Sequence, residues 1–312
     1  MTADNHNPTL AFRDSINLGT TGKSFLVVGL VRDCAKYLKA DVLRLKSALE
    51  QSEQLHWLII ESDSTDSTLS QLEKLKDQVS NFSFTSLGIL RNELPLRTER
   101  LAYCRNSYID QIRTNKVYKN IDYVIVSDFD GLNTHVSEAA ISSCWERKDW
   151  DMCAANQKGP YYDIWALRHK DWCPNDCFAQ YRFLKRYNTA KRAFCSSVYS
   201  KMITLPLSSD WIEVDSAFGG LAIYRRKLFN VARYVGLNEA GEEVSEHVSF
   251  HRALRQQGCR LFINPKMINA SCTDHTEHLH FLKRLRRKSK NLIGSVIKAV
   301  IGEKWFGQLK RQ

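Results

Sequence analysis

Two kinds of apolar spacing alternate along the first 130 residues of the chain. Short apolar runs predict strands, mostly continuous runs suited to burial on both faces; they span 24–31, 56–60, 82–87 and 123–127. Between them, apolar residues recur every three to four positions and predict helices; these span 35–50, 67–79 and 97–113. Strands and helices in this strict alternation are typical of an α/β protein with a mostly parallel sheet flanked by helices.

The pattern from about Met152 onward is less regular. We expect a helix at 246–254 and a late strand at 260–264, closed by Pro265 because proline cannot donate to a sheet ladder. Tryptophan and tyrosine are frequent in this half. Such side chains line pockets for flat, polar-rimmed ligands, and they fill a core equally well.

Composition narrows the class of protein without giving its function. The chain has 312 residues, 43 % of them apolar, with only 14 glycines and 6 prolines. These values exclude a collagen-like or an intrinsically disordered chain. The longest apolar run, Phe25 to Val31, is far shorter than the roughly 20 residues that a membrane-spanning helix needs. No transmembrane helix is therefore expected.

The N-terminal residues and the cysteines indicate a cytoplasmic protein. Met1 to Leu18 is polar and lacks a cationic start followed by an apolar block, so we expect no secretory signal and a flexible leader over 1–22. The nine cysteines are scattered and odd in number, which favours reduced thiols. Cys173 and Cys177, with His169 nearby, match no common zinc spacing.

Most of the positive charge lies at the C-terminus. The net charge is +11, and residues 283–312 hold ten basic residues and one acid, so the rest of the chain is near neutral. Apolar residues recur in this tail at a four-residue step, ending in Trp305. A basic amphipathic C-terminal helix on an anionic membrane fits this pattern best. A helix docked on the body is the alternative, and no motif that reads nucleic acid accompanies the charge.

Acidic clusters follow the second and the fourth predicted strand. Glu61–Asp66 comes after one, and Asp128 and Asp130 come after the other. Ligands of such sheets bind beyond the carboxyl ends of the strands, where both clusters would meet. Carboxylates two positions apart in an extended stretch point the same way and can share a divalent cation. That cation can bridge a diphosphate and neutralise it as it leaves. Taken alone, the two aspartates could equally cap a strand end.

The order of several segments resembles that of GT-A nucleotide-sugar glycosyltransferases. Ile59–Thr68 resembles their second-strand motif. Leu96–Asn106 resembles the helix that leads to the D-x-D motif, and Tyr123–Asp130 resembles the D-x-D strand itself. Tyr161–Arg168 (YYDIWALR) is similar to a segment of the fungal capsule-associated mannosyltransferase family and its bacterial relatives. Three later segments resemble acceptor-side motifs: Ser216–Leu221, Glu246–His251 and Ile263–Pro265.

This resemblance implies a Rossmann-like GT-A fold with an irregular acceptor-side half. It implies one domain over 23–280, with a nucleotide half at about 23–131 and an acceptor half at about 132–280. The basic tail would then occupy 281–312.

The resemblance also implies roles for single residues on the donor side. Asp63 would contact the nucleotide, with Glu61 and Asp66 beside it. Asp128 and Asp130 would hold Mn²⁺ or Mg²⁺, and neutral imidazole is a good further ligand, for which we favour His275 among three nearby histidines.

Arginines and acceptor-side residues complete the expected site. Arg97 and Arg105 would pair with a phosphate, or form salt bridges to the sheet-edge carboxylates. Asp163 and Arg168 would contact sugar hydroxyls, or pair with each other. Glu246 and His247 would contact the acceptor, and in an inverting enzyme one of them would act as the base. His251, one turn further on, has either a site role or a buried structural one.

We therefore expect a glycosyltransferase that moves a sugar from a nucleotide diphosphate sugar to a surface-glycan acceptor. The acceptor would be a glycan or glycolipid, lipid-linked because residues 283–312 would bring the enzyme to the inner face of a membrane.

Two other functions compete with this expectation. Val124–Gly131 (VIVSDFDG) also resembles the nucleophile strand of haloacid-dehalogenase-type phosphatases, with Asp128 attacking phosphorus and Asp130 as the acid/base. That strand normally opens its domain, and the later acidic pair of that family is missing here. The other alternative is a membrane-associated module that binds a sugar nucleotide without turnover.

Overall fold

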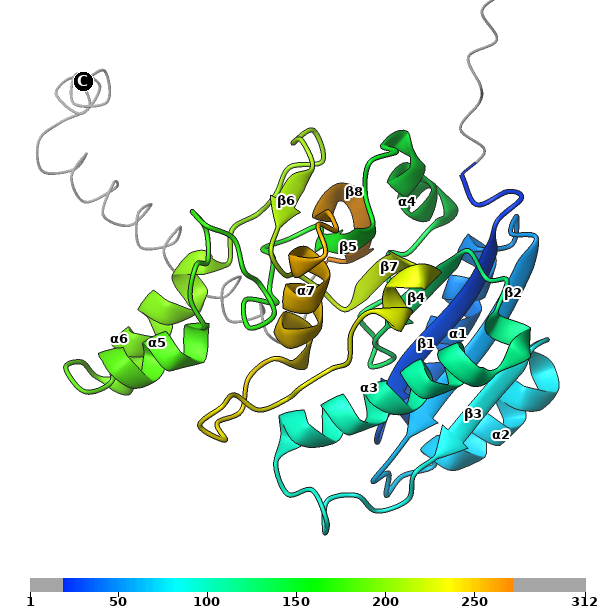
Figure 1. The fold of residues 1–312 in the computed structure, drawn as a ribbon, viewed down its shortest axis with the longest axis horizontal. Coiled ribbons are helices and arrows are strands. Elements are labelled where there is room, and N and C mark those ends of the chain that lie inside the picture. Colours follow the sequence, from blue (N-terminus) through cyan, green and yellow to red (C-terminus); the bar gives the residue numbers. More distant parts are fainter. Residues whose placement is uncertain (1–18, 272–312) are drawn as a thin grey trace, which may run out of the picture.

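The computed structural model describes residues 19–271, and their strands form one central sheet (Figure 1). Within this range the sheet has eight strands in the order β3-β2-β1-β4-β7-β5-β8-β6. Their bounds are β1 Ser24–Val31, β2 Gln54–Glu61, β3 Phe82–Ser86, β4 Tyr123–Ser127, β5 Met152–Gln157, β6 Ile212–Val214, β7 Leu221–Arg225 and β8 Leu261–Ala270. Strands β6 and β7 are antiparallel to their neighbours, and all other pairs are parallel. The expected mostly parallel sheet is confirmed, and the architecture is consistent with a GT-A fold.

Helices cover both faces of the sheet. Their bounds are α1 Ala35–Ala48, α2 Thr68–Gln78, α3 Arg97–Thr114, α4 Glu138–Ser142, α5 Cys177–Leu184, α6 Ala190–Ser197 and α7 Glu246–Gln256. On β1, Leu26 faces the core layer that contains residues of α3 and α7, while Phe25 faces the layer with residues of α1, α2 and α4. Because side chains alternate along a strand, a continuous apolar run supplies both layers. Helices α5 and α6 project from the side of this sandwich (Figure 1, light green).

The elements expected in the first half are confirmed to within about two residues at each end. In the second half only α7 and β8 match expected elements, and the sequence pattern did not predict β5, β6, β7, α4, α5 or α6. Strand β5 ends in the polar residues Asn156 and Gln157. Both are fully buried there, with their side-chain amides bonded to backbone carbonyls. Buried polar groups are tolerated when they are paired in this way.

The expectation that Pro265 closes the last strand is wrong. Strand β8 continues to Ala270, and its register against β5 shifts between the pairs Ala154–Ile263 and Asn156–Ile268. Pro265 lies in this irregular stretch, where the ladder requires no N–H from it. Its carbonyl accepts a hydrogen bond from Asn156 Nδ2 at 3.0 Å.

Strand direction determines where the candidate site lies. The carboxyl ends of β1, β2, β4 and β5 lie at one edge of the sheet, together with the amino end of the antiparallel β7. Segments from both halves of the chain thus meet at this edge. Within residues 19–271, none of the helices has the length and apolar character needed to cross a bilayer.

Candidate active site

A cavity of about 670 Å³ opens at the carboxyl edge of the sheet. Asp63, which follows β2, lines it together with Asp128 and Asp130, which follow β4. Residues from α3 and from the start of α7 form the facing wall, among them Arg105 and Glu246. The two acidic clusters that the sequence places after separate strands therefore face one shared space.

Two hydrogen bonds fix the backbone of Asp128 in the turn after β4. Asp128 N donates to the carbonyl of Gly220 at 2.9 Å, and Asn133 Nδ2 donates to the carbonyl of Asp128 at 2.6 Å. Phe129, between the two aspartates, is buried in the core. The anchored aromatic ring leaves Asp128 half-buried and Asp130 exposed at the cavity.

Carboxylates crowd this end of the cavity. Burial raises the pKa of Asp128 well above its usual value, and the negative charge of Asp130 adds to the effect, with smaller contributions from Asp163 and Glu246. The positive charge of Arg105 opposes the rise in this pKa. A divalent cation held by oxygen ligands would relieve the repulsion, so the residues present fit such an ion.

The described residues alone do not complete a metal site. Between residues 19 and 271, no group of three or more histidine, cysteine, aspartate or glutamate side chains is placed to hold a metal ion. The expected third ligand, His275, lies outside the described residues, as does the basic tail from 281 to 312. Asp128 and Asp130 would thus share an ion with His275, with water or with the phosphates of a bound substrate.

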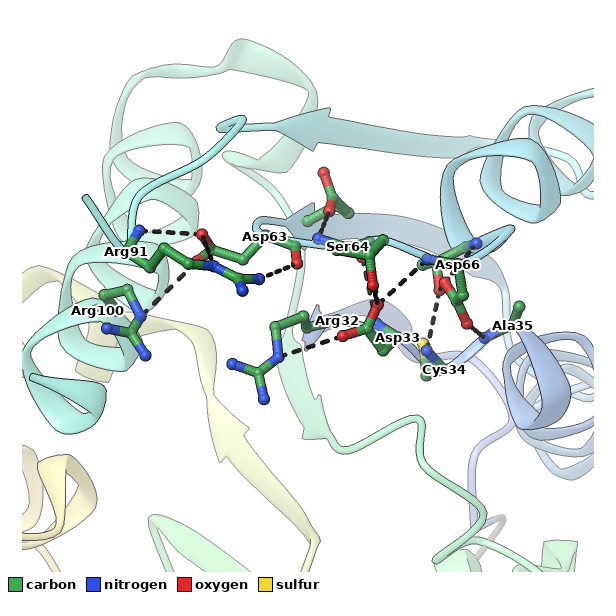
Figure 2. A network of polar contacts seen from close by, with 12 residues as sticks. Arg32, Asp33, Cys34, Ala35, Asp63, Ser64, Asp66, Arg91 and Arg100 are labelled. Atoms are coloured by element: carbon green, nitrogen blue, oxygen red, sulfur yellow. Dashed lines mark hydrogen bonds and ion pairs between the residues drawn. The ribbon is translucent and has the colours of Figure 1, made fainter. Parts of the chain in front are cut away.

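Asp63 is held by two arginines that sequence analysis did not single out (Figure 2). Arg91 donates to its carboxylate from the backbone N at 3.0 Å and from Nε at 3.2 Å, and Arg100 Nε lies 3.7 Å from the other oxygen. Burial alone would raise the pKa of Asp63, but the hydrogen bonds and charge of Arg91, together with Arg100, bring it below its usual value.

This network changes the role expected for Asp63. Its side chain is only 1 % exposed, against 14 % for Arg100, so little of the carboxylate is left for a ligand. Asp63 also has φ of +61°, a left-handed conformation that aspartate tolerates better than most residues and that recurs at functional sites. In Figure 2 the guanidinium groups of Arg100 and Arg32 extend on the same side of this network, and both line the cavity.

The other expected donor-side acids, Glu61 and Asp66, do not line the cavity. Glu61 accepts from Ser64 N at 3.0 Å and from the Ser86 hydroxyl, which fixes the loop after β2. Asp66 accepts from Ala35 N at 3.2 Å and from the hydroxyl of Thr68. Both carboxylates therefore join neighbouring strand–helix loops, as Figure 2 shows for Asp66 and Ala35.

Arginines of α3 reach the cavity in two different states. Arg97 is exposed, and its side chain forms no hydrogen bond or ion pair that involves the described part of the chain. Arg105 is 4 % exposed and donates from Nε to Glu246 Oε1 at 2.8 Å, between the rings of Phe218 and Tyr234. The expected salt bridge of Arg105 therefore joins α3 to α7 rather than to the sheet edge.

The imidazole of His247 is buried beside the cavity. It stacks on Phe218 with 4.0 Å between ring centroids and is 3 % exposed, yet it lines the cavity. Neither ring nitrogen has a hydrogen-bond partner within residues 19–271, although Nε2 lies 3.7 Å from Glu246 Oε1. Burial lowers the pKa of His247 well below its usual value, and the charge of Arg105 adds to this, so the ring is neutral near pH 7. A substrate hydroxyl would satisfy it.

His251 takes the structural alternative. It is fully buried and bonded at 2.9 Å on both ring nitrogens, to the hydroxyls of Ser216 and Tyr224. Burial, with help from the charge of Arg105, lowers its pKa to about 3. His251 does not line the cavity and serves as a core histidine with both nitrogens satisfied.

Asp163 and Arg168 lie in different surroundings. Asp163 lines the cavity, and its carboxylate accepts from Gly219 N at 3.0 Å and weakly from Ala166 N. Arg168 is not part of the lining and donates from Nη2 to Asp176 at 2.7 Å. The pairing considered between Asp163 and Arg168 is thus replaced by two separate contacts.

Apolar side chains form a second flank of the cavity, which sequence analysis did not predict. They come from the segment after β5 and from α5, α6 and the turn that follows: Ile164, Trp165, Phe178, Phe194, Val198 and Met202. Ile164 and Trp165 belong to the Tyr161–Arg168 segment, whereas no motif distinguishes the other four from core residues in the sequence. The eight cysteines of the described range are free thiols.

Comparisons with known proteins give distant structural likenesses. No protein-family model matches the chain, and no curated protein sequence matches it. The structure is similar to a mannosyltransferase from Pyrobaculum calidifontis in complex with GDP-Man and Mn²⁺, at 12 % identity and a TM-score of 0.47 over 81 % of this chain and 58 % of that one. It is similar to residues 1–349 of TarS from S. aureus, at 13 % identity and a TM-score of 0.44 over 80 % and 60 %.

A third similar structure is glucosyl-3-phosphoglycerate synthase from Mycobacterium tuberculosis in complex with UDP. It has 12 % identity and a TM-score of 0.35 over 80 % of this chain and 70 % of that one. This chain spans less than two thirds of the length of the mannosyltransferase and of the TarS fragment. These structures do not show the fungal capsule-associated family. At TM-scores below 0.5, function has to be judged from the site itself.

Proposed function

We propose that this protein is a metal-dependent glycosyltransferase that uses a nucleotide diphosphate sugar. One observation supports the proposal above all: the acidic ends of β2 and β4 line a single cavity, with Glu246 and His247 among its other lining residues. A nucleotide at one strand end and a diphosphate at the other fit the rule that ligands bind beyond the carboxyl ends of such strands.

The donor would lie across the ends of β1, β2 and β4. Asp63 would act mainly by holding Arg100 at the cavity wall, and Arg100 with Arg32 would meet the nucleotide. Arg97 offers an exposed guanidinium to a phosphate, a pairing that arginine makes with two parallel hydrogen bonds. The positive charge of Arg105 interacts with the carboxylates of Asp128 and Glu246, and it would also attract negative charge of a donor bound in the cavity.

Asp128 and Asp130 would hold Mn²⁺ or Mg²⁺, with His275 as a proposed third ligand. When bound, the ion supplies positive charge that stabilises the departing diphosphate. The acidic pair would thereby position the leaving group.

The acceptor would enter opposite the donor. The imidazole of His247, which has no hydrogen-bond partner within residues 19–271, would bind an acceptor hydroxyl. Glu246, which is fixed by Arg105, would orient that hydroxyl or accept its proton. Asp163 would bind sugar hydroxyls on the same side. We further propose a glycan or glycolipid acceptor, lipid-linked, and a cytoplasmic enzyme held at the inner face of the membrane by residues 283–312.

A turnover assay tests the proposal. The full chain is incubated with UDP-, GDP- and CMP-sugars, with and without Mn²⁺, and released nucleotide is measured. We expect a UDP- or GDP-sugar to release its nucleoside diphosphate only with metal, even slowly with water as acceptor, whereas the CMP-sugars, which carry no diphosphate, serve as controls. Release of inorganic phosphate from simple phosphomonoesters would favour the phosphatase alternative instead. Metal-dependent binding of a donor without any turnover, with glycan and lipid extracts present, would favour the non-catalytic module.

A further inference from the structure

The helical hairpin formed by residues 177–201, which contains α5 and α6, has an unusual charge. Residues 19–271 hold 34 basic and 29 acidic residues, and the hairpin contains six of the basic ones and no acid. The rest of the described chain is therefore close to neutral. The hairpin cations are Arg182, Lys185, Arg186, Lys191, Arg192 and Lys201.

Most of these cations are exposed and have no acidic partner among residues 19–271. Arg182 pairs with Glu242 at 3.1 Å, which ties the hairpin to the body. Arg186, Lys191 and Arg192 are exposed, and none of them forms an ion pair with a described residue. They lie at and beside the tip that joins the two helices, at the end that projects from the molecule (Figure 1).

Exposed aromatic rings accompany this charge. Phe183 is 56 % exposed and Tyr187 is 73 % exposed, and their ring centroids lie 5.6 Å apart. Large apolar side chains that stay exposed next to unpaired cations are typical of surfaces that sit in a lipid interface, where rings enter the headgroup region and cations meet anionic lipids.

The inner side of the same hairpin forms part of the candidate active site. Phe178 of α5 and Phe194 of α6 line its apolar flank, followed by Val198 and Met202. One element thus carries a cationic, aromatic outer tip and an apolar inner wall of the cavity. A hydrocarbon chain leaving the cavity on this side would reach the hairpin first.

We propose that the hairpin of residues 177–201 is a docking element for an anionic phospholipid surface, separate from the C-terminal tail. Its cations contact lipid headgroups, Phe183 and Tyr187 insert among them, and the apolar flank of the cavity is turned toward the bilayer. The proposal rests on the proposed function only where it concerns a lipid-linked acceptor. Docking itself needs neither donor nor turnover.

Hydrogen exchange on the full chain tests this docking locally, so that binding through residues 283–312 does not mask it. The backbone amides of 182–192 are followed by mass spectrometry with vesicles of phosphatidylcholine alone and of phosphatidylcholine mixed with phosphatidylglycerol. We expect slower exchange at these amides with the anionic vesicles only. Unchanged exchange there, while the protein sediments with the vesicles, would overturn the proposal, as would equal protection by single-stranded RNA.

Charge variants complete the test. Replacing three cations with glutamine (Arg186→Gln, Lys191→Gln and Arg192→Gln) should weaken binding to anionic vesicles at least about tenfold, since each cation near such a surface contributes about fivefold. The matched control removes the same charge from exposed lysines outside the hairpin: Lys74→Gln, Lys76→Gln and Lys119→Gln. Equal losses in the two variants would show a nonspecific charge effect and refute a docking element.

An aromatic variant and a donor assay keep the two proposals apart. Phe183→Ser with Tyr187→Ser should weaken vesicle binding without changing metal-dependent release of nucleotide. If nucleotide release is absent in every variant while the hairpin is protected by anionic vesicles, the proposed function fails and the docking element stands. Unchanged vesicle binding after loss of both rings would contradict the insertion of the hairpin tip.

Discussion

At the scale of single residues, the candidate site is built from charges that oppose one another. Asp41 of α1 is 3 % exposed and accepts from Gly131 N at 2.9 Å, directly behind the aspartate turn. Burial raises its pKa to about 6, and the negative charge of Asp130 adds to the rise. When Asp41 is ionised, its charge repels Asp130 and destabilises the acidic turn in the absence of a cation.

The variant Asp41→Asn should raise the free energy of unfolding at pH 8 by about 1–3 kcal/mol. The pKa of Asp41 is higher in the folded than in the unfolded chain, so its stabilising contribution is complete below pH 4 and is lost as pH rises through about 6. Asparagine keeps an acceptor for Gly131 N without the charge. Urea unfolding at several pH values without metal checks this. A gain that is just as large at pH 4 would contradict the assignment.

Arg105 and Glu246 form a buried pair whose two halves depend on each other. The variant Arg105→Met should lower the free energy of unfolding by about 3–5 kcal/mol, because it leaves the Glu246 carboxylate buried without its partner. Adding Glu246→Met should restore most of that loss. Urea denaturation of both single variants and the double variant gives the coupling. Strictly additive losses would show that the pair is not a coupled unit.

At the scale of elements, the residues just before β7 position two acidic residues of the site. Gly219 and Gly220 precede this strand with φ of +70° and +84°, values that disfavour other residues. Gly220 accepts from Asp128 N, and Gly219 donates to Asp163. One glycine pair from the second half of the chain thus positions acidic residues of both halves.

The variant Gly220→Ala should weaken metal-dependent nucleotide binding and lower the free energy of unfolding by about 1–3 kcal/mol. A Cβ there would lie 2.8 Å from the Tyr162 hydroxyl in addition to the left-handed strain. Gly241→Ala is the matched control, since Gly241 has φ of +74° and no atom within 4 Å of an added Cβ. Calorimetric nucleotide titrations with Mn²⁺ should be impaired for the first variant only, and equal impairment would argue against a positioning role.

At the scale of the whole molecule, local patterns predict the parallel half of the sheet better than the site. Leu26 and Val28 belong to runs whose spacing alone specifies strands, and Asp128 and Asp130 follow from their place after β4. The contacts of Asp63 with Arg91 and Arg100 depend on how loops far apart in sequence pack together. Sequence spacing carries no record of such contacts.

The second half of the chain shows the same limit. From the sequence alone, Pro265 predicts the end of a strand. Only the pairing of β8 with β5 reveals an irregular stretch in which the ladder needs no N–H from Pro265. From the sequence alone, Phe178 and Phe194 cannot be distinguished from core residues, because their position beside the cavity depends on how α5 and α6 pack against the rest of the protein. Roles that depend on long-range packing therefore require coordinates.

The most direct test of the central claim is calorimetric titration of the preferred nucleoside diphosphate with and without Mn²⁺. It is applied to the wild-type chain, to Asp130→Asn and to Asp77→Asn, which changes an exposed aspartate of α2 outside the cavity. We predict that Mn²⁺ tightens nucleotide binding at least tenfold for the wild type and for Asp77→Asn, and that Asp130→Asn loses this gain while its melting temperature without ligand is maintained. Equal metal-dependent binding by Asp130→Asn and the wild type would contradict a metal site at the end of β4.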